Sequence, residues 1–204
     1  MKNYICIKGQ KIELTEEQAE QICAVQNKGK VKLSDIPEGK TFKIGNHEFV
    51  VLEHSGDTTA IIRKDLLHED IEFGSNNNFS GSYVAAKCDE FADEITGVVG
   101  AENLVEHTVD LTSDDGLKDY GSIKCRCSLL TTNLYRRYVE ILDKFKPDRW
   151  WWLATAHSTE RHGNSNWAKC VSPAGVIDGD DYIYGIGVRP FLFLKSSIFE
   201  SSEN

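Results

Sequence analysis

Trp150-Trp151-Trp152-Leu153-Ala154-Thr155 is the stretch from which the fold of this sequence is best inferred, since it holds three of the four tryptophans. Bulky aromatic side chains suit a pleated, half-buried surface, so residues 151–153 predict a strand. Further along, Phe191-Leu192-Phe193-Leu194 is an almost unbroken apolar run, which is typical of a strand buried on both faces. We expect both strands, including Trp151 and Trp152, to form the core.

The segment between these two strands contains two groups of turn-forming residues. Ser172-Pro173-Ala174-Gly175 predicts a tight turn, because Pro presets φ at its second position and Gly tolerates conformations that a Cβ resists. A hairpin over residues 167–177 follows from that turn. Asp178-Gly179-Asp180-Asp181 is interpreted as a second turn, after which residues 182–186 lead through Gly187 into the final strand.

Arg189, beside Pro190, places a permanent charge in apolar surroundings. An arginine in such a place needs fixed acceptors, either backbone carbonyls or a carboxylate. We therefore predict a structural role for Arg189 and Pro190, with the arginine clamping chain segments together.

Taken together, these motifs resemble a large domain family of unknown function that is found widely in bacteria and phages. Its members carry W-W-L-R-S-P, a variable polar stretch, V-x-x-x-G, and G-V-R-P-A-L near the end. The resemblance covers about residues 31–198 and includes a segment, 129–136, that is similar to phage-type members. Ala154-Thr155-Ala156 stands where Arg-Ser-Pro is usual, so no contact of that arginine is carried over. The matching residues are Trp151-Trp152-Leu153, Val171-Ser172-Pro173-Ala174-Gly175 and Gly187-Val188-Arg189-Pro190-Phe191.

That family is similar to the C-type-lectin-like fold. Sulfatase-modifying factors use this fold, as do phage receptor-binding proteins with diversified ligand-facing residues. The resemblance therefore implies an α+β domain over residues 31–204, with twisted antiparallel sheets and packed helices, and a phage or prophage origin.

Residues 1–30 predict a small N-terminal appendage. Apolar and polar residues alternate through 4–7 and 11–14 on either side of Gly9, as in a hairpin. Thr15 and Gln18 form a capping-box pattern that opens a helix, which ends at residues 27–30. The appendage either docks on a partner or caps a sheet edge, and we favour capping.

The composition is ordinary for a soluble globular protein. Of 204 residues, 40% are hydrophobic and 27% are charged, which suits one domain with a modest addition. The formal net charge of -9 argues against binding to nucleic-acid backbones, which requires clustered Lys and Arg. The first residues lack a signal-peptide pattern, and no segment approaches the roughly 20 apolar residues of a membrane helix. We expect a cytoplasmic protein that a virion could carry, with no membrane contact.

Upstream of the tryptophans, residues 41–63 predict a three-stranded meander with turns at Gly45-Asn46 and Ser55-Gly56-Asp57. A helix capped by Ser82 follows a loop at residues 73–79, and its apolar side chains recur at helical spacing. We expect that face to pack on the central sheet. It comprises Val84, Cys88, Phe91 and Ile95.

A second helix is predicted over residues 133–145, capped by Thr132 and stopped by Pro147. Arg136 and Arg137 are expected to pair with Glu140 or Asp143 on its solvated side. The inward face is predicted to comprise Leu134, Tyr138, Ile141, Leu142 and Phe145.

The cysteines lack the spacing of a disulfide framework, so reduced and mostly buried thiols are expected at Cys6, Cys23, Cys88, Cys125, Cys127 and Cys170. Strand alternation places Cys125 and Cys127 on one face, where core packing explains them as well as a soft metal does. Cys170 could supply a third thiolate. In sulfatase-modifying factors a cysteine pair binds copper, so a cysteine-metal oxidase remains an alternative.

Other metal sites are disfavoured. The acidic runs at 110–116 and 178–181 lack the spacing of a calcium loop, and Asn166-Trp167 lacks the Asp of lectin calcium sites. His47 and His54, seven residues apart, point to opposite faces of a strand. We expect neither a metal nor a cofactor.

The polar segment 155–167 is the predicted binding site. It is rich in hydrogen-bonding residues and anchored at both ends by core strands, as in an adaptable recognition loop on a rigid scaffold. A plain surface loop is the alternative. His157 and Glu160 could act as acid and base, but no nucleophile or oxyanion element accompanies them, so catalysis is not expected. The predicted ligand-binding residues are His157, Glu160, Arg161, His162, Asn164, Asn166, Trp167, Tyr182 and Tyr184.

We therefore expect a non-catalytic binding protein of phage or prophage type that recognises a macromolecule, either a protein or a surface glycan. One alternative is an inhibitor of an intracellular host defence protein that acts through an acidic surface. The cysteine-metal oxidase is the other.

Overall fold

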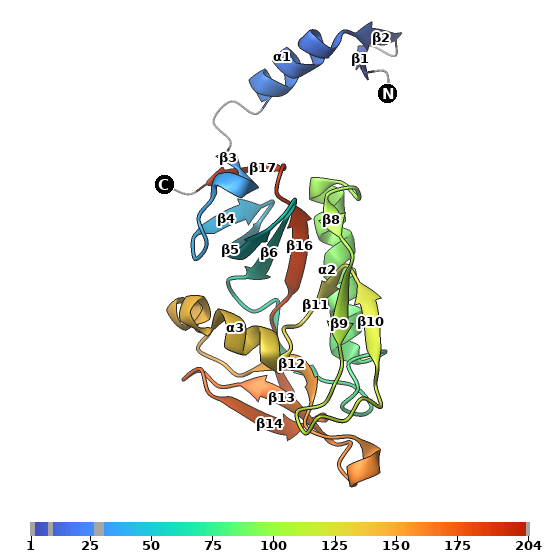
Figure 1. The fold of residues 1–204 in the computed structure, drawn as a ribbon, viewed down its shortest axis with the longest axis vertical. Coiled ribbons are helices and arrows are strands. Elements are labelled where there is room, and N and C mark those ends of the chain that lie inside the picture. The colour runs from blue at the N-terminus through green and yellow to red at the C-terminus, as the bar shows by residue number, and fades with distance from the viewer. Residues whose placement is uncertain (1–2, 8–9, 27–30, 203–204) are drawn as a thin grey trace.

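The computed structural model describes residues 3–7, 10–26 and 31–202 of the chain (Figure 1). It is a mixed α+β structure, 24% helical and 38% strand, and its sheets are mostly antiparallel. This confirms the expected fold class in its coarser form. None of the described helices is long and apolar enough to cross a membrane.

The N-terminal unit is a hairpin followed by a helix. Strands β1 (Asn3–Ile7) and β2 (Gln10–Leu14) pair antiparallel, and α1 spans Glu16–Gln26. The predicted capping box is confirmed, because the Thr15 amide donates to Gln18 Oε1 over 3.0 Å and the Gln18 amide donates to Thr15 Oγ1 over 3.2 Å. The prediction that this helix ends at residues 27–30 lies outside the described residues.

An eight-stranded sheet forms the upper part of the remaining chain in Figure 1. Its order is β11-β16-β6-β5-β4-β17-β3, and β8 also pairs with β16. The predicted meander over residues 41–63 is confirmed as β4, β5 and β6. The strands are β3 (Val31–Lys32), β4 (Thr41–Ile44), β5 (His47–Ser55), β6 (Thr58–Arg63), β8 (Leu104–Val105), β11 (Cys127–Ser128), β16 (Phe191–Lys195) and β17 (Phe199–Ser202).

A five-stranded sheet of order β14-β13-β12-β15-β7 has the tryptophan strand at its centre. Strand β12 pairs antiparallel with β13 and parallel with β15. A separate hairpin, β9 (His107–Asp110) with β10 (Ser122–Cys125), lies beside the long helix. The five strands are β7 (His68–Glu72), β12 (Trp151–Ala156), β13 (Trp167–Val171), β14 (Ile177–Asp181) and β15 (Gly185–Val188).

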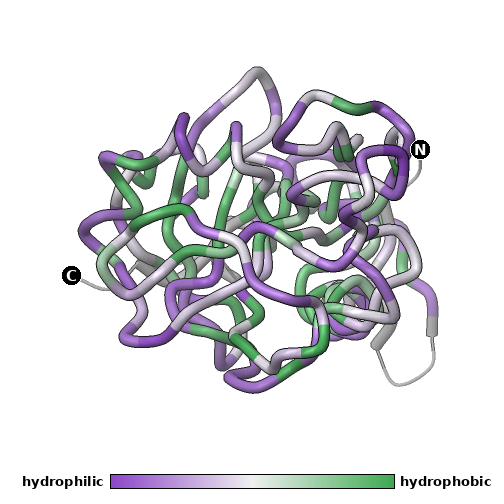
Figure 2. The backbone as a smooth tube through the Cα atoms, turned by 90° about the horizontal axis from the view of Figure 1, so that it is seen from below, coloured by the Kyte–Doolittle hydropathy of each residue, from purple (hydrophilic) through white to green (hydrophobic). Residues whose placement is uncertain are grey.

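Alternation along the strands divides the core in two. Val50 on β5 and Trp151 on β12 pack in a cluster with helix α3 (Thr132–Leu142), whereas Val51 and Trp152 pack in a cluster with helix α2 (Tyr83–Val99). Successive strand residues point to opposite faces, so β12 contributes to both clusters. It is buried along its whole length, which includes residues 151–153, where a core strand was predicted. Figure 1 shows α3 between the two sheets, and Figure 2 shows hydrophilic stretches along much of the periphery.

Both helices begin at hydroxyl caps. Ser82 Oγ accepts from the Ala85 amide at the start of α2, which confirms the predicted cap and its inward face. The cap of α3 is Thr131, one residue before the predicted Thr132, and its hydroxyl accepts from the Leu134 amide. Thr132 is already helical, and its amide donates to Thr155 Oγ1 over 2.9 Å.

The predicted arginine pairs on α3 are wrong. Arg136 pairs with Asp114 and Arg137 with Glu53, neither of which lies on the helix. Tertiary neighbours supply closer carboxylates than Glu140 or Asp143 do, since α3 lies between two sheets rather than on an open surface.

Residues 178–181 form a strand, so the prediction of a turn there is also wrong. Strand β14 is the outermost strand of its sheet, where one row of backbone groups needs no strand partner, so Gly and Asp are tolerated. Asp178 and Asp180 each accept from the next backbone amide. The turn that precedes β15 lies instead at residues 182–184.

Candidate functional site

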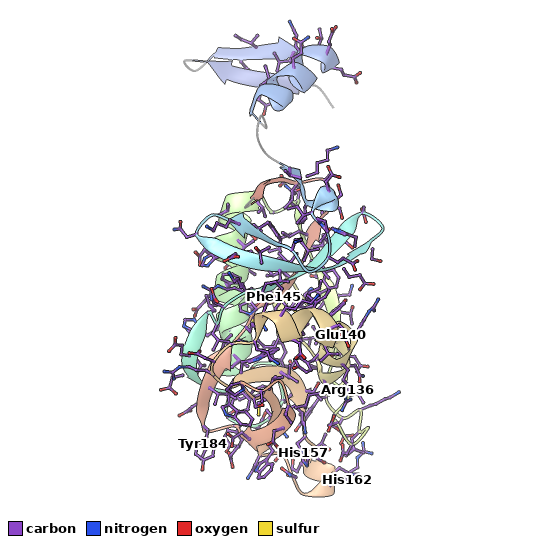
Figure 3. All side chains as sticks on the ribbon, turned by 90° about the vertical axis from the view of Figure 1, so that its left-hand side faces the viewer. Arg136, Glu140, Phe145, His157, His162 and Tyr184 are labelled. Atoms are coloured by element: carbon purple, nitrogen blue, oxygen red, sulfur yellow. The ribbon has the colours of Figure 1, made fainter. Side chains whose placement is uncertain are left out.

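The predicted recognition loop connects β12 to β13 at the lower end of the molecule in Figure 1. Residues 157–166, here called the recognition loop, contain a single 3-10 turn at Glu160–His162. Figure 3 shows His157, His162 and Tyr184 at the same end of the molecule. The ends of the loop are held together by a bond from the His157 amide to the Trp167 carbonyl, 2.9 Å long.

Two carboxylates from the segment after β9 bind side chains of the recognition loop. Asp115 Oδ2 accepts from Ser158 Oγ over 2.6 Å and lies 2.8 Å from His162 Nδ1. Asp119 accepts from Thr159 Oγ1 over 2.6 Å and pairs with Arg161. Hydrogen bonds from Ser113 and Ser158, together with His162, hold the pKa of Asp115 well below its usual range. The loop is therefore tied to the segment 115–119 by charge-assisted contacts.

Asn77 binds the backbone of the same loop from the protein interior. Its side chain is fully buried, and Nδ2 donates to the carbonyls of Ser158 and Trp167 over 2.9 and 2.8 Å. Its Oδ1 accepts from Tyr120 OH over 2.7 Å, and its backbone amide donates to the Ser165 carbonyl. One amide side chain thus contacts both ends of the recognition loop, which fixes the distance between them.

The structure divides the predicted site residues into two groups. Trp167 is 45% exposed and Tyr184 56% exposed, and Ile183 between the two tyrosines is 52% exposed. Facing inward are His157, whose ring centroid lies 6.0 Å from that of Trp167, and Tyr182, which packs on the core. Asn164 is half-buried. The other outward residues are Glu160, Arg161, His162 and Asn166.

Sequence reasoning missed the residues that position this loop. Asp115 lies in the acidic run 110–116, which the sequence disfavours as a calcium loop, Asp119 lies just beyond that run, and Asn77 lies in the loop predicted at residues 73–79. The sequence signal that could have indicated these contacts is charge complementarity. Two acids, Asp115 and Asp119, precede a loop that contains two basic residues, Arg161 and His162. We define the outward side chains Glu160, Arg161, His162, Trp167, Ile183 and Tyr184 as the loop surface.

The thiols whose side chains the structure describes pack in the core or against it. Cys127 and Cys170 are buried, and Cys125 packs against the cluster that contains α2. Burial raises the pKa of Cys125 and of Cys170 to about 12, so both groups are protonated thiols at pH 7. Within the described part of the chain, no three His, Cys, Asp or Glu side chains gather as a metal site. The side chains of Cys6 and Cys23 lie outside the described residues.

His47 and His54 have separate structural partners. His47 Nε2 lies 2.7 Å from Glu94 Oε1, and His54 contacts Thr59 Oγ1 and the Ile36 carbonyl at 2.8 and 2.9 Å. Each imidazole thus contacts partners of its own.

A cavity of about 520 Å³ is lined by strand β9, residues of the segment 112–116, the start of α3 and strands β11 and β16. His107 lines it, with Nε2 2.9 Å from Ser128 Oγ and with Phe191 and Phe193 at ring-centroid distances of 5.6 and 5.0 Å. Burial lowers the pKa of His107 to about 4, so this imidazole is neutral at pH 7.

The neutral His107 predicts an acid-sensitive fold. Between pH 6.5 and 4, His107 is protonated in the unfolded chain but stays neutral in the folded protein. The free energy of unfolding therefore falls as pH falls. We expect a loss of about 2 kcal/mol between pH 7 and pH 5 from this group. Urea unfolding at both pH values measures it, and His107→Gln should remove that part of the loss. An identical pH dependence in the variant would contradict the assignment.

Comparison of the chain with protein-family models, curated proteins and solved structures found no match. The geometry of the loop and of the cavity is therefore the basis for the functional argument.

Proposed function

We propose that this chain is a non-catalytic binding protein of phage or prophage type that recognises a macromolecule, either a protein or a surface glycan, through the loop surface. The observation that carries the proposal is the exposure of Trp167, Ile183 and Tyr184 beside the recognition loop. Trp and Tyr are the residue types most often found as energetic anchors of interfaces. Three large apolar side chains exposed close together are more typical of a contact surface than of solvated loops.

The hydrogen bonds and ion pairs that order the recognition loop support the same proposal. Three residues outside the recognition loop hold it in place. Asn77 binds its backbone, and Asp115 and Asp119 bind four of its polar side chains. A loop that is ordered before it binds loses less conformational entropy on association. The scaffold therefore favours recognition over a passive connection.

The fold proposal rests on the resemblance of the strand motifs. We propose a C-type-lectin-like domain for residues 31–204, in which the W-W-L strand is the central β12 and the G-V-R-P motif leads from β15 into β16. Antiparallel sheets with α2 and α3 packed against them are compatible with this assignment.

An inhibitor of a host defence protein is the second candidate, and strand β14 favours it. On this outermost strand Asp181 is the strand partner of the exposed Trp167, whereas Asp178 and Asp180 point to the other face of the sheet. A carboxylate beside an aromatic anchor suits a basic groove on a partner protein.

Site-specific cross-linking tests the proposal. Benzoylphenylalanine at position 167 or 184 should capture one and the same macromolecule in the cells that make the protein or in those its virion meets. Benzoylphenylalanine at position 98 is the matched control, because Val98 is 55% exposed on α2, outside the loop surface. Equal capture of that macromolecule from position 98, or no capture from positions 167 and 184, would contradict the proposal. A host intracellular protein as the captured species would favour the second candidate.

A further inference from the structure

The cavity beside α3 has the features of a ligand site that is separate from the loop surface. Its volume of about 520 Å³ lies within the range of small-molecule pockets, roughly 300–1,000 Å³. Hydroxyl groups and aromatic rings both line it, from β9, β11, β16 and the first turn of α3.

The first turn of α3 points positive backbone groups at this cavity. The first amides of a helix have no acceptor within the helix and carry its partial positive charge. Thr155 accepts from the Thr132 amide and Thr131 from the Leu134 amide. The Asn133 amide, at the cavity wall, has no acceptor among the described residues.

A second, independent observation is an unpaired hydroxyl at the same place. Thr132 lines the cavity and is only 2% exposed, yet its Oγ1 has no hydrogen-bond partner among the described residues. Buried hydroxyls are nearly always paired, and leaving one unpaired costs about 1–3 kcal/mol. A ligand group in the cavity would supply that partner.

Three charged side chains line the cavity, the carboxylates of Asp110 and Asp114 and the guanidinium of Arg136. Each carboxylate has a cation nearby, Lys118 beside Asp110 and Lys169 3.5 Å from Asp114, and Arg136 lies 3.7 Å from Asp114. Lys118 and Lys169, which lie outside the lining, thus offset the two carboxylates, and the positive groups on the cavity wall are Arg136 and the start of α3. Arg136 follows Thr132 by four residues and so lies on the same face of α3.

An apolar wall faces the cavity from β16. Phe191 and Phe193 stand there edge to face at 5.1 Å, Leu134 adds apolar surface on α3, and the neutral His107 adds no charge. From this arrangement we infer that the cavity binds a small organic anion, with a carboxylate or phosphate at the start of α3 and near Arg136, and an apolar body against Phe191 and Phe193. This site goes beyond the macromolecular binding proposed for the loop surface.

Amide chemical shifts of the ¹⁵N-labelled full chain test the inference directly. Phenyl phosphate and benzoate should each shift the amides of residues 132–134 saturably, whereas benzyl alcohol, which lacks the charge, and inorganic phosphate, which lacks the apolar body, should bind at least about tenfold more weakly. No saturable shift, or equal binding of either control compound, would overturn the inference.

Two neighbouring arginines provide the matched variants. Arg136→Gln should weaken binding of phenyl phosphate by roughly tenfold. Arg137→Gln should leave it unchanged, because Arg137 pairs with Glu53 away from the cavity. Both side chains are more than half exposed, so neither substitution endangers the fold. The same weakening in both variants, or in neither, would contradict the placement of the anion.

Discussion

Replacing Arg189 with methionine is expected to lower the free energy of unfolding by about 4 kcal/mol, because each buried carbonyl left without a donor costs about 1–3 kcal/mol. Arg189 is only 1% exposed. Its Nε donates to the Arg63 carbonyl over 2.9 Å, and its terminal nitrogen donates to the carbonyls of Lys64 and Phe145, each over 3.0 Å. It also lies over the ring of Trp151, 5.2 Å from the centroid.

Arg189 therefore joins three chain segments, as the sequence predicted. Burial lowers its pKa only to about 10, so the group keeps its charge and all its donors at pH 7. Methionine keeps the unbranched part of the side chain as far as the position of Nε, so the loss comprises the hydrogen bonds and the contact of the guanidinium with Trp151. Urea unfolding followed by tryptophan fluorescence gives the free energy.

The matched control is Arg149→Met. Arg149 is largely exposed and pairs with Glu69 at 3.3 Å, a surface pair that contributes at most about 1 kcal/mol. Comparable losses in Arg189→Met and Arg149→Met would contradict the role of Arg189 as a clamp.

Replacing Asn77 with alanine is expected to cost about 3 kcal/mol and to loosen the recognition loop. The substitution leaves the carbonyls of Ser158 and Trp167 and the hydroxyl of Tyr120 without the partner that joins them. Amide exchange of residues 157–167 should become faster than that of β12, since the loop opens without unfolding the sheet.

Asn76→Ala is the control for Asn77→Ala. Asn76 is exposed, and its side chain accepts only from the nearby Asn78 amide, so its loss should stay below about 1 kcal/mol with unchanged exchange in the loop. Equal exchange in the two variants would show that Asn77 does not hold the loop.

Those parts of the fold that depend on local pattern could be predicted. Trp151–Ala156 and Phe191–Lys195 are strands because their own side chains demand burial on both faces, and the caps of α1 and α2 are short-range hydrogen bonds. The turn predicted at residues 178–181 is wrong, although Asp and Gly are residue types typical of turns. In an outermost strand these residue types cost little, and a sequence does not show which strand lies at the edge.

The candidate site could be predicted only as a loop with exposed recognition residues. Asn77 and Ser158 are 81 residues apart, and Asp115 is 43 residues from the same serine. No spacing rule links such positions, since their contact depends on the pairing of two sheets and a connecting segment. The cavity was missed for the same reason, because His107, Thr132 and Phe191 come from separate elements.

The most direct test of the central claim is the affinity of the cross-linked partner for the loop surface, measured by titration calorimetry. The triple variant Arg161→Ala, His162→Ala and Trp167→Ala should bind roughly a hundredfold more weakly than the unaltered protein, because interface anchors of this type dominate binding. Val98→Ala should bind as the unaltered protein does, and all three proteins should unfold at similar urea concentrations. Undiminished affinity in a folded triple variant would contradict the claim that the loop surface binds the partner.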